Sequence, residues 1–219
     1  MNIIYLLFHG LSPYSGSSKK ILHQVKGFEA CGHRVSLCTY SIADNGHRVR
    51  MINNEIIEDY GTGKPAAAKR RVSYQCIYRY AVTHQVELIY VRSFHNANPF
   101  TIRLFSKLRK AGIKIAMEIP TYPYDSEYAG FPLVTRLGIQ VDKVFRKTLA
   151  KHVNAIVTFS DYHCIFGQRT IQISNGVDFD SIPLKKTVAK NTSVIHLLGV
   201  AEVHYWHGYD RLIEGLGKY

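Results

Sequence analysis

Two side chains that suit anion binding and proton transfer follow the apolar segment Leu88–Val91. Arg92 carries a guanidinium, which binds anionic groups through two parallel hydrogen bonds. His95 carries an imidazole, which gives or takes a proton near neutral pH. An alternative remains open at this point, in which Asn98 caps the next helix and His95 is a solvated loop residue. The pattern therefore nominates Arg92 and His95 as active-site residues.

A second group of functional side chains follows the apolar segment Ile113–Ile119. Residues 118–128 hold three acids and three tyrosines, among them Glu118, Tyr122 and Asp125. Two prolines in the same stretch favour an extended backbone. Tyrosine rings pack on sugar faces, and carboxylates accept hydrogen bonds from hydroxyl groups. The composition suits a carbohydrate ligand, and a rigid structural loop is the alternative.

A third candidate site is the loop His9–Ser18, which is rich in Gly, Ser and Pro. Gly16 permits close approach of backbone to a ligand, and the N-terminus of the following helix attracts phosphate. Ser17 or Ser18 is expected to cap that helix. The spacing differs from the dinucleotide-binding fingerprint, and an ordinary tight loop is the alternative. The stretch Gly61–Lys64 lacks the spacing of a phosphate-binding P-loop and is expected to be a flexible connection.

The elements that must position these loops alternate between strands and helices. Strands are predicted at Ile3–Phe8, Arg34–Tyr40, Leu88–Val91, Ile113–Ile119, Ala155–Phe159 and Thr170–Ser174, and a hairpin around Asn53-Asn54 joins segments 47–52 and 55–60. Alternation of this kind predicts an α/β fold with a doubly wound, parallel, Rossmann-like sheet. In such sheets the loops at the carboxyl ends of the strands meet, and ligands bind there.

In the first domain, three helices are expected from apolar residues at a 3.6-residue period. The first of them, after the His9–Ser18 loop, is expected to end at Gly32. A fourth, basic helix is expected over Ala66–Thr83. The expected buried faces are Ile21, Leu22, Val25 and Phe28 in the first helix, Phe100, Leu104, Phe105 and Leu108 in a helix over Pro99–Lys110, and Leu137, Val141, Val144, Phe145 and Leu149 in a later one.

The chain is expected to hold one full domain and the beginning of another. Residues 1–183 form the first domain, and residues 184–193 are a polar linker. Residues 194–219 contain one apolar strand and the start of a helix, which together cannot bury their apolar faces. We therefore expect an incomplete second Rossmann-like domain, whose last helix leaves its apolar face partly uncovered.

Charge and cysteine content narrow the class of protein. The chain has 28 Lys and Arg against 16 Asp and Glu, a net charge of +12. Basic helix faces suit a peripheral contact with the inner face of an anionic membrane, and nucleic acid is disfavoured because no nucleic-acid-binding motif accompanies them. No apolar run is long enough to span a bilayer, and no signal peptide is expected at Met1–Phe8. Four cysteines without paired spacing favour reduced thiols and a cytoplasmic location.

Four segments together resemble glycosyltransferase family 4, which has the GT-B fold. They are residues 15–20 with 32–35, residues 155–160, the sequence Ile-Ser-Asn-Gly-Val-Asp at 173–178, and residues 206–216. The resemblance implies two Rossmann-like domains that face each other across a cleft. It also implies retaining transfer of a sugar from a nucleotide-diphosphate donor to a glycan or lipid-linked acceptor, as in polysaccharide biosynthesis, without a metal or another cofactor.

The resemblance also implies roles for single residues. Arg92 or His95 occupies the place of the family's active-site histidine. Donor-binding residues would be Gly16, Ser17, Asn175, His207 and Arg211, and acceptor-binding residues would be Tyr14, Glu118, Tyr122 and Asp125. The chain departs from the family at His207 and Glu202, which stand where a Lys and an Arg usually hold the diphosphate.

The family's Glu-x7-Glu donor motif lies beyond this sequence. The chain by itself is therefore expected to be a weak or inactive fragment of the enzyme. Two alternatives stay open: a non-catalytic sugar- or partner-binding module, and another GT-B enzyme such as a nucleotide-sugar epimerase.

Overall fold

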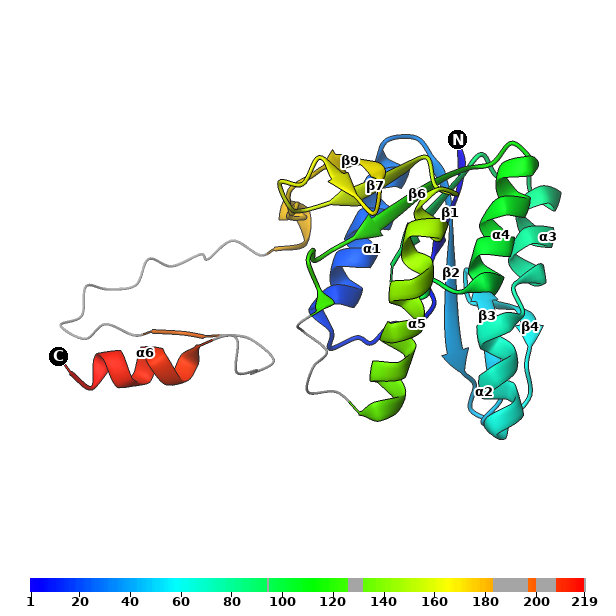
Figure 1. The fold of residues 1–219 in the computed structure, drawn as a ribbon. Coiled ribbons are helices and arrows are strands. Elements are labelled where there is room, and N and C mark those ends of the chain that lie inside the picture. The colour runs from blue at the N-terminus through cyan, green and yellow to red at the C-terminus, as the bar shows by residue number, and fades with distance from the viewer. Residues whose placement is uncertain (94, 126–131, 183–196, 200–207, 219) are drawn as a thin grey trace. The chain divides into compact units, whose positions relative to one another are not determined.

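The structure, a computed structural model, describes the chain except for residues 94, 126–131, 183–196, 200–207 and 219 (Figure 1). It divides into two compact units, Met1–Asp178 and Phe179–Tyr219. The first unit contains the sheet, and each unit is described by itself below.

The first unit is built on a mostly parallel sheet. Its strands are β1 (Asn2–Leu6), β2 (Arg34–Ile42), β3 (Arg48–Ile52), β4 (Glu55–Asp59), β5 (Leu88–Arg92), β6 (Lys114–Ile119), β7 (Ala155–Thr158), β8 (Cys164–Ile165) and β9 (Gln168–Gln172). They lie in the order β4-β3-β2-β1-β5-β6-β7-β9-β8. Neighbours from β2 to β9 pair in parallel, whereas β3, β4 and β8 run antiparallel to their neighbours. The expected α/β class, parallel sheet and hairpin at Asn53-Asn54 are confirmed.

Helices cover both faces of this sheet (Figure 1). They are α1 (Gly16–Ala30), α2 (Gly63–Val72), α3 (Gln75–Thr83), α4 (Pro99–Lys110) and α5 (Leu133–Ala150). Alternate residues of β1 point to opposite faces, as strand geometry requires. Ile3, Tyr5 and Leu7 pack in the core with Ile21 of α1, whereas Ile4 and Leu6 share the other core with α3, α4 and α5. Continuous apolar residues in β1 follow from this two-sided burial.

The strand order reverses at β1. The chain moves from β1 to β2 on one side and later returns to place β5 on the other side. The loops that leave β1 and β5 therefore depart in opposite directions and leave a crevice at the carboxyl edge of the sheet. This confirms that the loops singled out in the sequence meet at one edge.

The expected continuous helix over Ala66–Thr83 is wrong, because the chain breaks at Ser73 and Tyr74 into α2 and α3. Tyr74 is buried against the edge of the Phe8 ring, with 5.6 Å between the ring centroids. Its hydroxyl donates to the carbonyl of Arg71 at 2.8 Å. The helix also begins earlier than expected, at Gly63, since Pro65 fits a first turn where no intrahelical N–H bond is needed.

The expected buried face of α5 is confirmed at Leu149, which is buried, and at Phe145, which packs against the core, but it is wrong for the three residues that precede them. Leu137, Val141 and Val144 are 58%, 46% and 71% exposed, whereas Ile139 and Asp142 on another face are buried. The helix is turned so that Asp142 reaches the loops at the sheet edge, and this requirement cannot be read from apolar periodicity. Phe100 of α4 and Leu22 of α1, both expected in the core, are each 46% exposed.

The capping expected of Ser17 or Ser18 is wrong as well, since α1 begins at Gly16 and its N-cap position is Ser15. The hydroxyl of Ser18 instead accepts a hydrogen bond from the backbone of Ser12 at 3.0 Å. The other end of the helix is as expected: Gly32 follows it with φ of 79°, a conformation that glycine adopts readily.

The second unit contains the short helix η2 (Phe179–Ser181) and α6 (Tyr209–Leu216). Leu212, Ile213 and Leu216 of α6 are half or more exposed, in line with the uncovered apolar face expected of the last helix. Residues 197–199 form no strand, and the linker and the rest of the strand expected at 194–199 lie outside the described residues. Within the described part of the chain, no helix is long and apolar enough to cross a bilayer.

Candidate functional site

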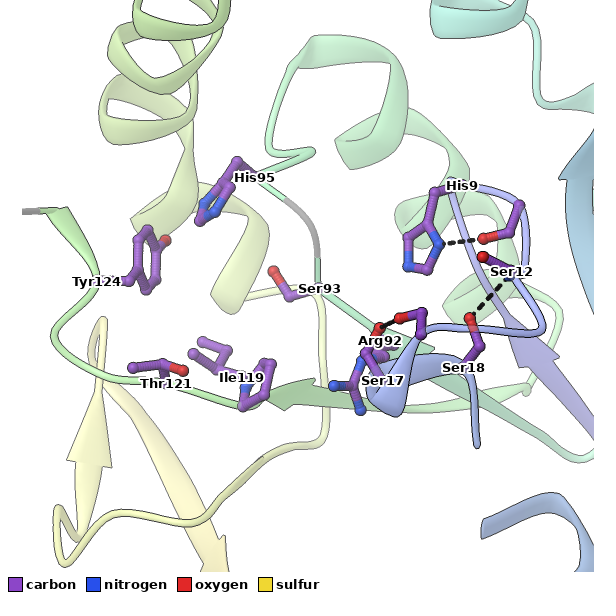
Figure 2. Close-up of a pocket in the computed structure, with 13 residues that line it drawn as sticks. His9, Ser12, Ser17, Ser18, Arg92, Ser93, His95, Ile119, Thr121 and Tyr124 are labelled. Atoms are coloured by element: carbon purple, nitrogen blue, oxygen red, sulfur yellow. Dashed lines mark hydrogen bonds between the residues drawn. The ribbon is translucent and has the colours of Figure 1, made fainter. Parts of the chain in front are cut away.

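A cavity of about 390 Å³ lies at the carboxyl edge of the sheet, beside the point where the strand order reverses (Figure 2). Three loops enclose it, and they follow the neighbouring strands β1, β5 and β6. Its lining consists of His9, Gly10, Ser12, Ser15, Ser17, Ser18, Arg92, Ser93, His95, Ile119, Pro120, Thr121 and Tyr124. The lining is thus rich in hydroxyl groups and holds two histidines and one arginine.

The loop after β1 forms the serine-rich side of the cavity. The hydroxyls of Ser15 and Ser17 lie 2.8 Å apart, and Ser18 binds the backbone of Ser12 (Figure 2). Gly10 lies so close to β2 that a β-carbon there would be 2.8 Å from the carbonyl oxygen of Tyr40. The loop therefore packs tightly on the sheet, with the N-terminus of α1 beside the cavity. Backbone N–H groups at a helix N-terminus favour anions.

A buried ion pair lies beneath the cavity. Arg92 Nη1 donates to Glu118 Oε1 at 2.6 Å. The second carboxylate oxygen accepts from the Tyr90 hydroxyl at 2.7 Å and from Gln24 of α1 at 2.9 Å. Glu118 is fully buried, while Arg92 keeps 8% exposure and lines the cavity. Burial, followed by the charge of Glu118, raises the pKa of Tyr90. The phenol therefore stays protonated and donates to the carboxylate.

His95 lies at the other side of the cavity, beside Tyr124 (Figure 2). The two ring centroids are 4.5 Å apart, and His95 has a positive φ of 49°. A non-glycine residue in this region costs about 1–3 kcal/mol unless its surroundings hold it, and such residues concentrate at functional sites. Burial lowers the pKa of His95, with opposing contributions from the charges of Asp142 and Asp125. The imidazole is therefore predominantly neutral at pH 7.

Asp142 of α5 joins the loops that carry His95 and Tyr124. Its Oδ1 accepts from the backbone N–H of Ala97 at 2.9 Å, and its Oδ2 accepts from the Tyr124 hydroxyl at 3.1 Å. The carboxyl is 2% exposed, and burial raises its pKa. Asp142 thus fixes one loop after β5 and another after β6 to the same helix.

Ion pairs between α5 and Asp125 hold the loop after β6. Arg146 donates to both carboxylate oxygens of Asp125, at 2.7 and 3.2 Å, and Lys143 Nζ lies 3.3 Å from Asp125 Oδ2. The hydrogen bonds from Arg146 lower the pKa of Asp125. Tyr122 packs edge-on against Tyr162, with 5.0 Å between centroids. Neither Asp125 nor Tyr122 lines the cavity.

The segment after β9 is tied to α1 by polar contacts. Lys20 donates to Oδ1 of Asn175 at 2.7 Å, and its ammonium lies 3.4 Å from the centre of the Phe159 ring. Burial and the charge of Arg92 lower the pKa of Lys20, while the charge of Glu118 raises it. Further along α1, Lys26 donates to Asp178 at 2.8 Å. Lys20 therefore adds positive charge near the Arg92–Glu118 pair.

The structure brings together three of the residues nominated from the sequence: Arg92, His95 and Ser17 all line the cavity. Glu118 lies below it and acts on the cavity through Arg92. The other nominated residues that the structure describes do not line the cavity. Gly16 and the 95% exposed Tyr14 lie in or next to the loop after β1, and Asn175 contacts Lys20. Arg211 lies on α6 in the second unit, and His207 lies outside the described residues.

Sequence reasoning missed Asp142, Lys20 and Ser93. Asp142 stood in an expected amphipathic helix as an ordinary polar residue, and nothing in its spacing marks it as buried. Ser93 lies between the nominated Arg92 and His95, so its place in the sequence could have marked it as a site residue. Thr121 and Tyr124 were part of the nominated loop but were not singled out.

The arrangement can bind an anion at one side and a hydroxyl-rich ligand at the other. Arg92, Lys20 and the start of α1 supply positive charge or N–H groups, and His95, Ser93, Thr121 and Tyr124 supply hydrogen-bonding groups. Among the described residues, no group of three His, Cys, Asp or Glu side chains is placed to hold a metal ion.

Comparison with models of known protein families, with curated proteins and with solved structures finds no match to this chain.

Proposed function

We propose that the cavity is the acceptor-side half of a glycosyltransferase site, in an enzyme of the GT-B type. The complete enzyme would transfer a sugar from a nucleotide-diphosphate donor to a glycan or lipid-linked acceptor, with retention of configuration. The observation that carries the proposal is the convergence of Arg92, His95 and the serine-rich loop on one cavity at the strand-order reversal. The volume lies within the range of small-molecule sites, roughly 300–1,000 Å³.

Each side of the cavity has a role in this proposal. The leaving diphosphate of a sugar donor gains negative charge during transfer, and fixed cations or helix dipoles stabilise that charge. In this proposal, Arg92 and the N-terminus of α1, which lie at one side of the cavity, would stabilise that charge. The neutral imidazole of His95 can accept a hydrogen bond from a sugar hydroxyl at the other side. Ser93 and Thr121 offer hydroxyls to the rest of the sugar.

Binding and turnover test different parts of this proposal. Titration of the chain with a short glycan or with a nucleotide-sugar is expected to shift the backbone amide signals of Ser17, Ser93 and Thr121 in an NMR spectrum. We expect the variant Thr121→Val to weaken glycan binding, whereas Thr148→Val, an exposed change on α5, leaves it unaltered. Failure of both ligand classes to bind at the cavity would contradict the proposed function.

An assay for sugar transfer or for release of the nucleotide diphosphate tests turnover separately from binding. Turnover of a nucleotide-sugar by the 219-residue chain would support the proposed activity directly. Glycan binding without turnover would support only the acceptor-side role of the cavity.

A non-catalytic sugar-binding module is the second candidate. The observation in its favour is that the cavity lining is dominated by hydroxyl side chains, while Arg92 is already engaged by Glu118. Glycan binding that is unaffected by any nucleotide or nucleotide-sugar would favour this candidate over the enzyme.

A peripheral membrane contact fits the same proposal, since a lipid-linked acceptor resides at a bilayer. The support is the exposed stripe of α5 (Leu133, Leu137, Val141, Val144), with the exposed Arg136 and Lys147 on the same helix. Apolar side chains flanked by cations suit an anionic lipid surface. Flotation with phosphatidylglycerol vesicles is expected to carry the chain, and Leu137→Ser with Val144→Ser is expected to abolish this.

A further inference from the structure

Three arginines lie around Tyr40 of β2, and a fourth, Arg71, follows one of them on α2; none of the four lines the cavity described above. Arg48 and Arg50 belong to β3, and Arg70 and Arg71 belong to the end of α2. Tyr40 belongs to β2, the strand that pairs with β3, and α2 runs beside the β3–β4 hairpin (Figure 1). We refer to Arg48, Arg50, Arg70 and Arg71 as the arginine cluster.

Tyr40 lies at the centre of this cluster. Arg48 Nη1 donates to the Tyr40 hydroxyl at 2.6 Å, and the Arg70 guanidinium carbon lies 4.1 Å from the centre of the Tyr40 ring. The ring is 8% exposed. Two guanidinium groups from different elements are therefore held on one aromatic side chain, one at its hydroxyl and one over its face.

Arg50 adds a fixed charge beneath the surface. It is 1% exposed, and its Nη1 donates to the carbonyl of Leu7 at 2.7 Å. The Nε atoms of Arg50 and Arg70 are both buried without a hydrogen-bond partner among the described residues. A buried donor without a partner costs free energy, and an acceptor that reaches the partly exposed Arg70 would recover that cost at its Nε.

The cluster lacks neutralising acids. Within the described part of the chain, none of its four arginines forms an ion pair with a carboxylate. Glu58 pairs with Arg50 in the β3–β4 register, but its carboxylate lies 3.6 Å from Arg79 and 3.9 Å from Lys69. Asp59 is engaged by His47 at 2.8 Å. Both nearby acids are thus already engaged by side chains outside the cluster.

Mutual repulsion acts within the cluster. Burial lowers the pKa of Arg70, and although Tyr40 opposes this, the charges of Arg71, Arg48 and Arg50 lower it further. Like charges held together with little compensation destabilise the free protein, and an anion that binds among them relieves this repulsion. Planar guanidinium groups match the oxygens of a phosphate.

We infer that the arginine cluster is a binding site for a phosphate-type oxyanion. Arg48, Arg70 and Arg71 would contact the anion, because these three are partly or fully exposed, and Arg50 would act from beneath. The backbone N–H of Tyr40 donates to the carbonyl of His9 at 3.3 Å, so the cluster lies next to the loop that lines the main cavity. The inference does not depend on the proposed glycosyl transfer, since it follows from charge and burial alone.

Inorganic pyrophosphate is the first probe. We expect saturable shifts of the arginine Nε–Hε NMR signals of Arg48 and Arg70, together with a rise in melting temperature. Arg70→Gln is expected to weaken binding about tenfold, the loss that one charged hydrogen bond typically represents. Arg71→Gln is the substitute test in case Arg70→Gln fails to fold, because it is an exposed change that leaves Tyr40 and the sheet untouched. It is expected to weaken binding in the same way.

Two further variants separate this site from other sources of anion binding. Arg103→Gln, a change of a cation on α4, is expected to leave pyrophosphate binding unaltered. Lys20→Gln lies near the main cavity and is expected to leave the Arg70 signal shift intact. Equal losses in Arg103→Gln and Arg70→Gln, or loss only in Lys20→Gln, would overturn the inference.

Vesicles distinguish a soluble phosphate from a lipid headgroup. If pyrophosphate binds at the cluster, the ligand group can come from a soluble molecule. Binding to phosphatidylglycerol vesicles without binding to pyrophosphate would identify the oxyanion as a lipid phosphate. The site is then supported when Arg70→Gln or Arg71→Gln weakens vesicle binding and Arg103→Gln does not. Absence of binding to both probes would contradict it.

Discussion

Arg92 at the end of β5 donates to the fully buried Glu118 at the end of β6, with 2.6 Å between Nη1 and Oε1. The two residues follow different apolar segments, and the sequence suggested separate roles for them. In the structure they form one unit, in which the carboxylate holds the guanidinium at the floor of the cavity. Glu118 is therefore a positioning residue for Arg92.

Replacing Glu118 by Gln is expected to destabilise the protein by about 3 kcal/mol, because the substitution leaves the buried charge of Arg92 without its partner. Urea unfolding at pH 7 measures the change. Glu29→Gln, on the exposed end of α1, serves as the control and is expected to stay within about 0.5 kcal/mol of the wild type. Similar unfolding free energies for the two variants would show that the ion pair does not stabilise the fold.

Asp142→Ala is expected to cost about 3 kcal/mol, since it removes the acceptor for both the Ala97 N–H and the Tyr124 hydroxyl. Asp142→Asn keeps one acceptor oxygen and is expected to cost about half as much. Gln140→Ala on the exposed side of α5 is the matched control. Equal stability of the alanine variants at 142 and 140 would rule out the joining role of Asp142.

His95 is expected to make stability depend on pH. Burial lowers its pKa in the folded state, so below about 6.5 the unfolded chain binds more protons than the folded one. Stability therefore falls as the pH drops from about 6.5 through the folded pKa, and it is regained above this window.

The variant His95→Asn tests this linkage, because asparagine tolerates the positive φ at this position. Unfolding free energies measured from pH 5 to 8 are expected to show a shallower slope below pH 6.5 in the variant. Gln172→Asn, an exposed change at a side chain that does not titrate, is expected to keep the wild-type slope. An unchanged slope in His95→Asn would show that His95 does not cause the pH dependence of stability.

Gly10→Ala is expected to destabilise by about 1–3 kcal/mol, because its β-carbon would overlap the carbonyl oxygen of Tyr40. Gly27→Ala on α1 has no atom within 4 Å of the added carbon and is expected to stabilise by about 0.5–1 kcal/mol through helix propensity. Thermal unfolding of both variants checks the opposite signs. Stabilisation by Gly10→Ala would contradict the close approach of the loop to β2.

The sequence sufficed to predict most strands and the convergence of their loops. Buried strands such as β1 and β5 are continuous apolar runs, and the rules of parallel sheets then place Arg92, His95 and Ser17 at one edge. The break at Tyr74 escaped prediction because helix propensity is a weak local preference. Burial of the Tyr74 ring against Phe8 outweighs it.

The sequence alone determined the α/β class, the parallel pairing of the central strands and the three loops that form the cavity, because local apolar patterns and chain connectivity fix these features. Tertiary structure alone decided which face of α5 is buried, that Asp142 joins two loops, and that Arg48 and Arg70 meet at Tyr40. These contacts join residues far apart in the chain, and their free energy depends on distance and burial rather than on spacing in the sequence.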